Sequence, residues 1–162
     1  MDEQLKIKTQ EIIKLLKDNN IKFEIYEHEP IFSYDIAEKV SKELGFSGTE
    51  SKSLFLKDKN KKNYIFFTIQ GQKVDFKKLN KILGEKIAIC ESDEMNKIID
   101  CYPGCVSPFG HNKDIPIITD SIVFEQGKII FSPGVPTKTL IVSSEEFKKI
   151  LQIIDNRVIY YN

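Results

Sequence analysis

The sequence predicts an α/β (α+β) protein, with a mixed, strongly curved, barrel-like β-sheet of about six to seven strands and short helices packed around it. Three observations predict this class. Runs with the alternating apolar pattern of strands occur in both halves of the chain, and runs with helical spacing lie unevenly between them. Strands directly follow strands in the middle and at the end, which disfavours a doubly wound parallel sheet. The 162 residues are the length of one domain, which we expect to span residues 1–162.

The first third of the chain predicts two helices with a strand between them. Residues 5–20 carry apolar side chains at helical spacing and end at a pair of asparagines. Residues 21–25 alternate between apolar and polar, as in a half-buried strand, and Pro30 stops this strand. Ser33 is suited to cap the second helix, which Gly45 ends.

The middle of the chain predicts a hairpin followed by short elements. Two runs that favour strands, 53–57 and 64–69, flank a charged turn. Residues 75–84 begin with an aspartate cap and end in glycine, which indicates a short helix. Residues 86–90 predict a short strand, and residues 92–100 predict a short helix that begins with a serine cap.

The last third predicts strands and one terminal helix. Strands are expected on both sides of residues 125–127, and residues 137–143 predict another strand. The run that follows has helical spacing, with Ser143 or Ser144 as its cap. Residues 157–161 favour a final strand.

The charge balance disfavours one broad class of partner. Lys plus Arg total 24 and Asp plus Glu total 24, so the net charge is zero, which argues against an extended, high-affinity grip on nucleic acid. A local basic patch is compatible with this balance. The hairpin turn holds four such cations, which either steer one end of a nucleic acid or form a solvated turn: Lys57, Lys59, Lys61 and Lys62.

The chain also lacks the signals of export and of membranes. Its first residues contain no apolar run of signal-peptide length, and no window reaches the roughly 18 apolar residues of a membrane span. We therefore expect a cytoplasmic protein without membrane contact, whose three cysteines are reduced thiols. Nothing in the sequence sets the oligomeric state.

The segment CYPGCVSPFGHNKDIP, residues 101–116, gathers the side chains of nucleophiles and metal ligands into one loop. Cys101, Cys105 and His111 are spaced C-x3-C-x5-H. A structural zinc site needs a fourth ligand, and His28 is distant in sequence, so we expect no metal. A thiol nucleophile, Cys105 with His111 as its base, is an alternative, although free cysteines are more often buried and inert.

The same segment can act through its backbone. Pro103 and Pro108 are rigid and bracket Gly104, which is free to adopt a positive φ. Consecutive amides there could hold a carbonyl or a developing oxyanion, with His111 at the rim. A second Pro/Gly loop, residues 131–137, is placed to form the opposite wall. The alternative is that both loops are ordinary turns.

A lysine completes the candidate site. Lys52 alternates with Leu54 and Leu56, so it points into the interior if they do. A lysine at the mouth of an apolar pocket suits a phosphate or a carboxylate. The alternative is a surface lysine whose stem lies along apolar neighbours.

Several stretches, in this order, together resemble the YbaK/prolyl-tRNA-synthetase-associated family of free-standing editing domains. They are GTESKSLFLKD, KVDFKKL, PGCVSPFG, IPIITDSIVFE, KIIFSPG and KTLIVSSEEFKKI. The resemblance extends from about Ile21 to Leu151, and the order of the stretches is more specific than any one of them. No P-loop, dinucleotide fingerprint or nucleophile elbow competes with it.

The resemblance implies a curved mixed sheet and hydrolysis of wrongly charged aminoacyl-tRNA, mostly tRNA(Pro). It implies a G-x-x-x-P loop at Gly104–Pro108, and a strand lysine, Lys52, that holds the terminal nucleotide. No cofactor, metal or covalent intermediate is implied, because the neighbouring ribose hydroxyl helps to activate water. The catalytic residues expected are Lys52, Gly104 and Pro108. The substrate-binding residues expected are Cys105, Val106, Ser107, Phe109, Ser132 and Gly134.

The residues after the loop bear on the substrate. The alanine-specific branch of this family tends to carry Asn-Asp there and His-Pro in the later loop, whereas this chain has FGHNKDIP and FSPG. It is more similar to branches that remove serine or threonine, or to branches whose amino acid is unsettled. The implied partner is the acceptor end of mischarged tRNA, and an aminoacyl-tRNA synthetase is compatible as a second partner. The alternative function is a non-catalytic module that binds aminoacyl-adenosine or a tRNA 3′ end.

Overall fold

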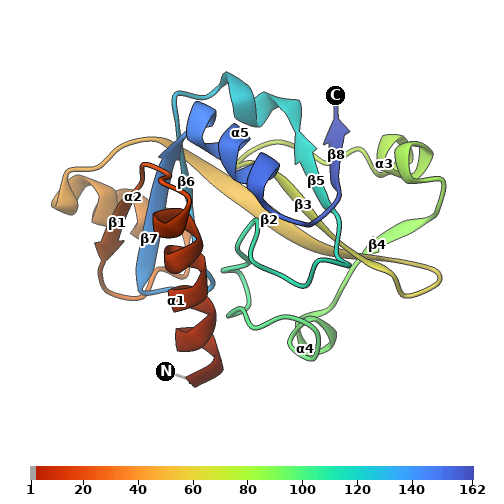
Figure 1. Cartoon of the computed structure of the whole chain (residues 1–162), viewed down its shortest axis with the longest axis horizontal. Coiled ribbons are helices and arrows are strands. Elements are labelled where there is room, and N and C mark those ends of the chain that lie inside the picture. Colours follow the sequence, from red (N-terminus) through yellow and green to blue (C-terminus); the bar gives the residue numbers. More distant parts are fainter. Residues whose placement is uncertain (1–2) are drawn as a thin grey trace.

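The computed structural model describes residues 3–162, and helices surround a central sheet (Figure 1). The α-helices are α1 (Glu3–Asp18), α2 (Tyr34–Leu44), α3 (Phe76–Leu83), α4 (Ser92–Met95) and α5 (Ser144–Ile153), with one 3-10 helix, η1 (Ser121–Glu125). The strands are β1 (Glu24–Glu27), β2 (Thr49–Asp58), β3 (Asn63–Ile69), β4 (Ile87–Ile89), β5 (Ile117–Asp120), β6 (Lys128–Phe131), β7 (Lys138–Ser143) and β8 (Val158–Tyr161).

The strands within residues 3–162 form one mixed sheet of eight strands in the order β1-β7-β6-β2-β3-β5-β8, and β4 pairs with β2. Neighbours β2–β6, β3–β5 and β5–β8 are parallel, and the other pairs are antiparallel. The mixed α/β class is thus confirmed. The sheet has one strand more than the upper expectation, and it runs from β1 to β8 as an open sheet without closing into a barrel.

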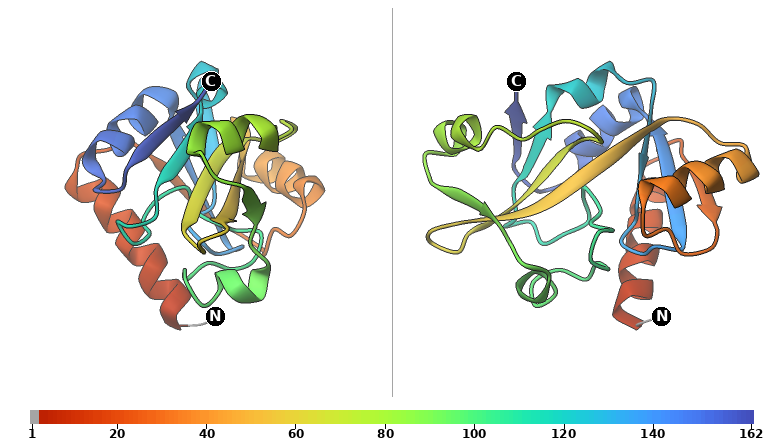
Figure 2. Two further views of the ribbon diagram at one scale, coloured as in Figure 1. Left: turned by 90° about the vertical axis from the view of Figure 1, so that its right-hand side faces the viewer. Right: turned by 180° about the vertical axis from the view of Figure 1, so that it is seen from behind.

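Both faces of the central strands are buried. In β3, Ile65 and Phe67 face the cluster that also contains Ile12 of α1 and Phe147 of α5, and the rings of Phe67 and Phe147 stack at 4.9 Å between centroids. Phe66 faces the opposite cluster, with α3. Figure 2 (left) shows α1 and α5 on one side of the sheet, with α2 and α3 on the other.

Most predicted helix boundaries are confirmed by their caps. The side chains of Ser33, Asp75 and Ser143 accept hydrogen bonds from amides in the first turns of α2, α3 and α5. Helix α4 is shorter than predicted, and its N-cap is Glu91 rather than Ser92.

One predicted strand segment is a different element. Residues 121–125 form the 3-10 helix η1, because the side chain of Asp120 accepts a hydrogen bond from the amide of Ile122 and turns the chain out of β5. Of the helices within residues 3–162, none is long and apolar enough to cross a membrane.

Candidate active site

The site lies where one edge of β2 loses its neighbour. Residues Thr49 and Glu50 pair with β6, and Leu56–Asp58 pair with β4. Strand β3 occupies the other edge of β2 from Ser51 to Lys57, so β6 and β4 share one edge and leave a gap between them. Strand β2 therefore connects the two halves of the sheet, and the unpaired stretch of its edge leaves an opening between β6 and β4.

A cavity of about 450 Å³ lies at this opening. Four segments line it: Glu50–Leu54 of β2, Pro103–Val106 at the start of the G-x-x-x-P loop, and two further segments. The first of these segments comes before and within α2, and the second connects β6 to β7. Their lining residues are His28, Ile31, Phe32, Ser33, Tyr34, Ala37, Ile130, Phe131, Ser132, Val135, Pro136, Lys138 and Thr139.

Lys52 lies in the wall formed by β2, where it is half-buried. Its Nζ donates a hydrogen bond to the carbonyl oxygen of Gln72 at 2.8 Å, in the segment after β3. An ammonium has three N–H donors, so two remain for a ligand. The side chain is therefore held by the protein without being neutralised by a carboxylate.

The G-x-x-x-P loop presents backbone toward the cavity. Gly104 has a φ of +85°, and a Cβ built there would meet no atom within 4 Å. The amide of Cys105 donates to the carbonyl of Tyr102 at 2.8 Å, so it closes the turn and cannot also serve an oxyanion. Among the backbone hydrogen bonds of residues 3–162, none uses the amides of Gly104 and Val106 as donors. These two amides are the available ones.

Three of the predicted site residues lie behind this wall. Ser107, Pro108 and Phe109 are buried and do not line the cavity. Phe109 packs edge-on against Phe131 at 5.6 Å between ring centroids, and the hydroxyl of Ser107 donates to the carbonyl of Phe109 at 2.9 Å. These residues set the shape of the loop from the inside.

His111 is part of this support, and its expected place at the rim is wrong. It is buried, and its Nε2 donates to the carbonyl of Ser107 at 2.8 Å. Burial, followed by the nearby charge of Lys8, lowers the pKa of His111 to about 4, so the ring is neutral at pH 7. It holds the G-x-x-x-P loop and is remote from solvent.

The two Pro/Gly loops lie side by side rather than on opposite walls. The amide of Tyr102 donates to the carbonyl of Gly134 at 2.8 Å, and the thiol of Cys105 contacts Ser132. Ser132 lines the cavity, whereas Gly134 is buried behind it against Cys101. The segment before and within α2 supplies the opposite wall.

The thiols are poorly suited to nucleophilic attack. Burial raises the pKa of Cys105 to about 11 and also raises the pKa of Cys101. The reactive form is the thiolate, which is therefore scarce at pH 7. Within residues 3–162, no group of three or more His, Cys, Asp or Glu side chains is arranged to hold a metal ion.

Glu50 was missed by the sequence analysis. It lines the cavity two residues before Lys52, and burial raises its pKa to about 7. Its position could have been found, because residues i and i+2 of a strand share a face. Perturbed carboxylates in clefts are typical of functional sites.

We expect Glu50→Gln to stabilise the protein at high pH. The pKa of Glu50 in the folded state lies above its value of 4.5 in the unfolded chain, so the folded state binds the proton more tightly. Stability is then lost as pH rises from about 4.5 to 7. The variant removes this penalty, so its free energy of unfolding at pH 8 should be about 1–2 kcal/mol higher than that of wild type.

Urea unfolding at pH 4 and at pH 8 measures this effect. At pH 4 the difference between wild type and Glu50→Gln should be small, because Glu50 is protonated in the folded state and mostly protonated in the unfolded state. Glu11→Gln, at an exposed position of α1, is the matched control and should change neither value. An equal difference at both pH values would contradict the expectation.

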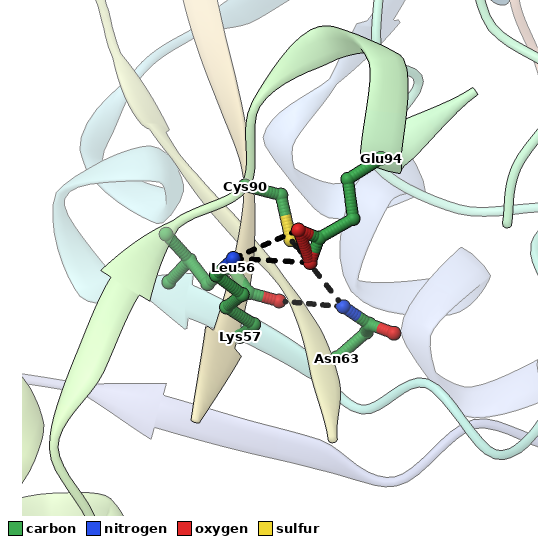
Figure 3. Close-up of polar contacts among 5 residues, drawn as sticks. All are labelled: Leu56, Lys57, Asn63, Cys90 and Glu94. Atoms are coloured by element: carbon green, nitrogen blue, oxygen red, sulfur yellow. Dashed lines mark hydrogen bonds and ion pairs between the residues drawn. The ribbon is translucent and has the colours of Figure 1, made fainter. Parts of the chain in front are cut away.

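The hairpin lysines do not belong to this cavity. The ammonium of Lys57 pairs with Glu94 at 2.8 and 3.1 Å, next to Asn63 and Cys90 (Figure 3), and Lys59 pairs with Glu85 at 3.8 Å. Figure 1 shows the turn between β2 and β3 at the end of the molecule opposite β1 and α2. The structure therefore favours a solvated turn at this place.

Two exposed aromatic rings lie at the rim instead. Phe32 lines the cavity and is 63% exposed, and Tyr102 is 39% exposed. Their centroids are 5.8 Å apart. Tyr102 lines a second cavity of about 520 Å³, which shares Pro103 and Pro136 with the first. The two rings thus lie between neighbouring hollows.

His28 has a local role. Its Nδ1 donates to the carbonyl of Glu29, and its Nε2 accepts from the hydroxyl of Thr139, both at 2.7 Å. Both of these contacts are with neutral groups, a carbonyl and a hydroxyl. They join the segment before α2 to β7 on the far wall.

The sheet that divides at β2, and the pocket built from loop backbone and one strand lysine, define a class of α/β domain with a small-ligand cavity. A family model described as the aminoacyl-tRNA editing domain matches residues 30–150. The chain belongs to this family.

Individual proteins agree with this assignment. The chain is 27% identical to the prolyl-tRNA editing protein ProX of Acetoanaerobium sticklandii, over 91% of this chain and 92% of that one. It is 24% identical to the multifunctional Ser/Thr-tRNA deacylase ProXp-y of Escherichia coli strain K12, over 88% and 87%. A crystal structure described as a trans-editing enzyme for prolyl-tRNA synthetase superposes with a TM-score of 0.72 at 18% identity, over 93% and 94%.

Proposed function

We propose that this chain is a trans-editing hydrolase that removes a small amino acid from mischarged tRNA. The observation that carries the proposal is the cavity itself: Lys52, Gly104 and Val106 line one hollow, and within residues 3–162 the amides of the two loop residues donate no backbone hydrogen bond. Family membership supplies the substrate class, an aminoacyl ester on the 3′ end of a tRNA.

The chemistry asks little of the protein, because the ester is already activated. Water adds to the ester carbonyl carbon, the bond from that carbon to the ribose oxygen breaks, and the ribose oxygen takes up a proton. The free amino acid and an uncharged tRNA result. Amides such as those of Gly104 and Val106 stabilise the oxyanion, and the neighbouring ribose hydroxyl helps to activate the water.

Lys52 is proposed to hold the terminal nucleotide. Its two remaining N–H donors suit a phosphate or a ribose oxygen. This contact would orient the ester so that its carbonyl lies next to the available amides. Such positioning is the main contribution that a rigid pocket makes when the substrate's own hydroxyl assists the reaction.

The size of the cavity favours small amino acids. Ile31, Ala37 and Val135 line the cavity, and their apolar side chains limit the room for the aminoacyl side chain. Hydrophobic pockets separate substrates that differ by one methylene only modestly, so several small residues would be accepted. We propose serine, threonine or alanine, in line with the Ser/Thr deacylase named above.

The unpaired end of a tRNA has a fitting contact surface at the rim. Exposed aromatic rings such as Phe32 and Tyr102 can stack on bases without sequence preference. Binding through such stacking does not need a broad basic surface. The net charge of zero is consistent with a contact limited to the acceptor end. We infer a cytoplasmic location, where tRNA is charged, and a synthetase as a second partner.

A deacylation screen tests the proposal. Purified protein is mixed with tRNA(Pro) charged with alanine, serine, threonine or cysteine, and with the cognate charged tRNAs of the same amino acids. We expect release of at least one small amino acid well above the uncatalysed rate. Tight binding of an aminoacyl-adenosine analogue without hydrolysis of any charged tRNA would instead favour a binding module.

A further inference from the structure

Of the titratable side chains that line the cavity, all but one contact a polar group of the protein. Lys52 donates to Gln72, and Lys138 pairs with Glu27 at 3.4 Å. His28 uses both ring nitrogens, on Glu29 and Thr139. Among residues 3–162, no cation lies within 4 Å of the carboxylate of Glu50, and its side chain makes no hydrogen bond. An unpaired carboxylate in a half-enclosed cavity is costly unless a ligand uses it.

The backbone holds Glu50 firmly in this position. Its carbonyl accepts a hydrogen bond from the amide of Gln70 at 2.9 Å, and it pairs with Ile130 of β6. The ring of Tyr34 is close enough to interact with the Glu50 charge, and its hydroxyl donates to the carbonyl of Ser51 at 3.2 Å. The backbone of Glu50 is therefore fixed at the last residue that pairs with β6 before the gap.

Glu50 and Lys52 share one face of β2, about 7 Å apart along the strand. Lys52 is proposed above to bind the terminal nucleotide. In an aminoacyl ester, the α-ammonium lies one carbon from the scissile carbonyl and a few bonds from the ribose. A carboxylate two residues from the nucleotide-binding lysine is thus at the right distance to meet that ammonium.

We propose that Glu50 binds the α-ammonium of the aminoacyl group, an inference that rests on the proposed function. Every aminoacyl-tRNA carries this group whatever its side chain, so such a contact recognises the ester as that of a free amino acid. It orients the carbonyl toward the amides of Gly104 and Val106. It also makes the site selective against substrates whose amine is blocked, because the carboxylate would then remain buried and unpaired.

The test compares seryl-tRNA with N-acetylseryl-tRNA, prepared on the same tRNA, for wild type, Glu50→Gln and Glu11→Gln. We expect Glu50→Gln to lower kcat/KM for seryl-tRNA by roughly 10- to 100-fold, the range of a hydrogen bond to a charged group. For N-acetylseryl-tRNA the same variant should differ from wild type by less than about twofold, since this substrate has no ammonium to bind. Glu11→Gln should match wild type on both.

A loss that is equal for the two substrates would overturn the inference, since it would assign Glu50 to proton transfer or to structure. Thermal melting checks that Glu50→Gln is folded. A binding measurement with an adenosine that carries an amide-linked seryl group at its 3′ position, free or N-acetylated, separates the inference from the proposed function. If wild type hydrolyses neither ester yet prefers the free amine through Glu50, only the hydrolytic function fails. Equal binding of both analogues by wild type overturns the inference.

Discussion

Lys52→Ala should lower kcat/KM for the deacylation of any susceptible aminoacyl-tRNA by at least about 100-fold, the scale of losing a charged group that positions the reacting ester. Lys52 is the cation in the β2 wall of the cavity. Its ammonium donates a hydrogen bond to a carbonyl oxygen and is not paired with a carboxylate, so its positive charge is available to a ligand. Alanine supplies no donor that could replace it. Steady-state deacylation on the best substrate of the screen measures the loss.

The variant should remain folded. Within residues 3–162, the Lys52 ammonium makes one hydrogen bond, to the carbonyl of Gln72, in a half-buried segment that water can reach, so the loss of stability should be about 1 kcal/mol. Lys57→Ala is the matched control, because Lys57 lies on the same strand and pairs with Glu94 away from the cavity. It should retain activity. Full activity of Lys52→Ala on every susceptible substrate would remove the assignment.

Local sequence signals predicted most of the elements of this fold. Caps such as Ser33 and Asp75 act on amides within the next turn, so their effect depends on the neighbouring residues alone. The strand pattern around Lys52 was equally local, and it placed the lysine in the wall of a cavity. Glu50 follows from the same alternation, and it was missed because a glutamate in a strand carries no signal of its own.

The cavity itself has no local signature. It exists because Glu50 of β2 pairs with Ile130 of β6, and Leu56 pairs with Ile89 of β4, so both partners lie far from β2 along the chain. The expected position of the second loop on the opposite wall was wrong for the same reason, since it depends on contacts between segments distant in the chain. Tyr102 and Gly134 join the two loops by a hydrogen bond that neither segment indicates alone.

Residue type was a poor guide to the role of the loop. Cys105 and His111 have the chemistry of a nucleophile and a base, yet burial raises the pKa of the thiol and lowers that of the imidazole. Burial is a tertiary property, so their reactivity could not be settled from spacing. Glu50 is the opposite case, because an ordinary residue type lies in an unusual environment. Its raised pKa indicates a stability cost, and such costs are tolerated mainly where they serve function.

The second large effect is expected from a change in the backbone of the G-x-x-x-P loop. Gly104→Val should lower kcat/KM by about 100- to 1,000-fold, the range for removal of an oxyanion donor, whereas Cys105→Ala should lower it by less than about fivefold. Gly104 has a φ of +85° and open space where a Cβ would be, so the cost of valine comes from its backbone preference and from the branched side chain placed in the cavity. In Cys105→Ala the amide still donates to Tyr102 and the turn is kept.

Gly84→Val is the matched control for strain. Gly84 also has a positive φ, +72°, and open space around a Cβ, but it ends α3 away from the cavity. It should lose stability by about 1–2 kcal/mol and keep its activity, whereas Gly104→Val loses activity at a similar cost in stability. Deacylation rates and urea unfolding of the three variants, measured side by side, separate these effects. A loss in Cys105→Ala as large as that in Gly104→Val would restore the thiol mechanism, because sulfur, and not the backbone, would then carry the reaction.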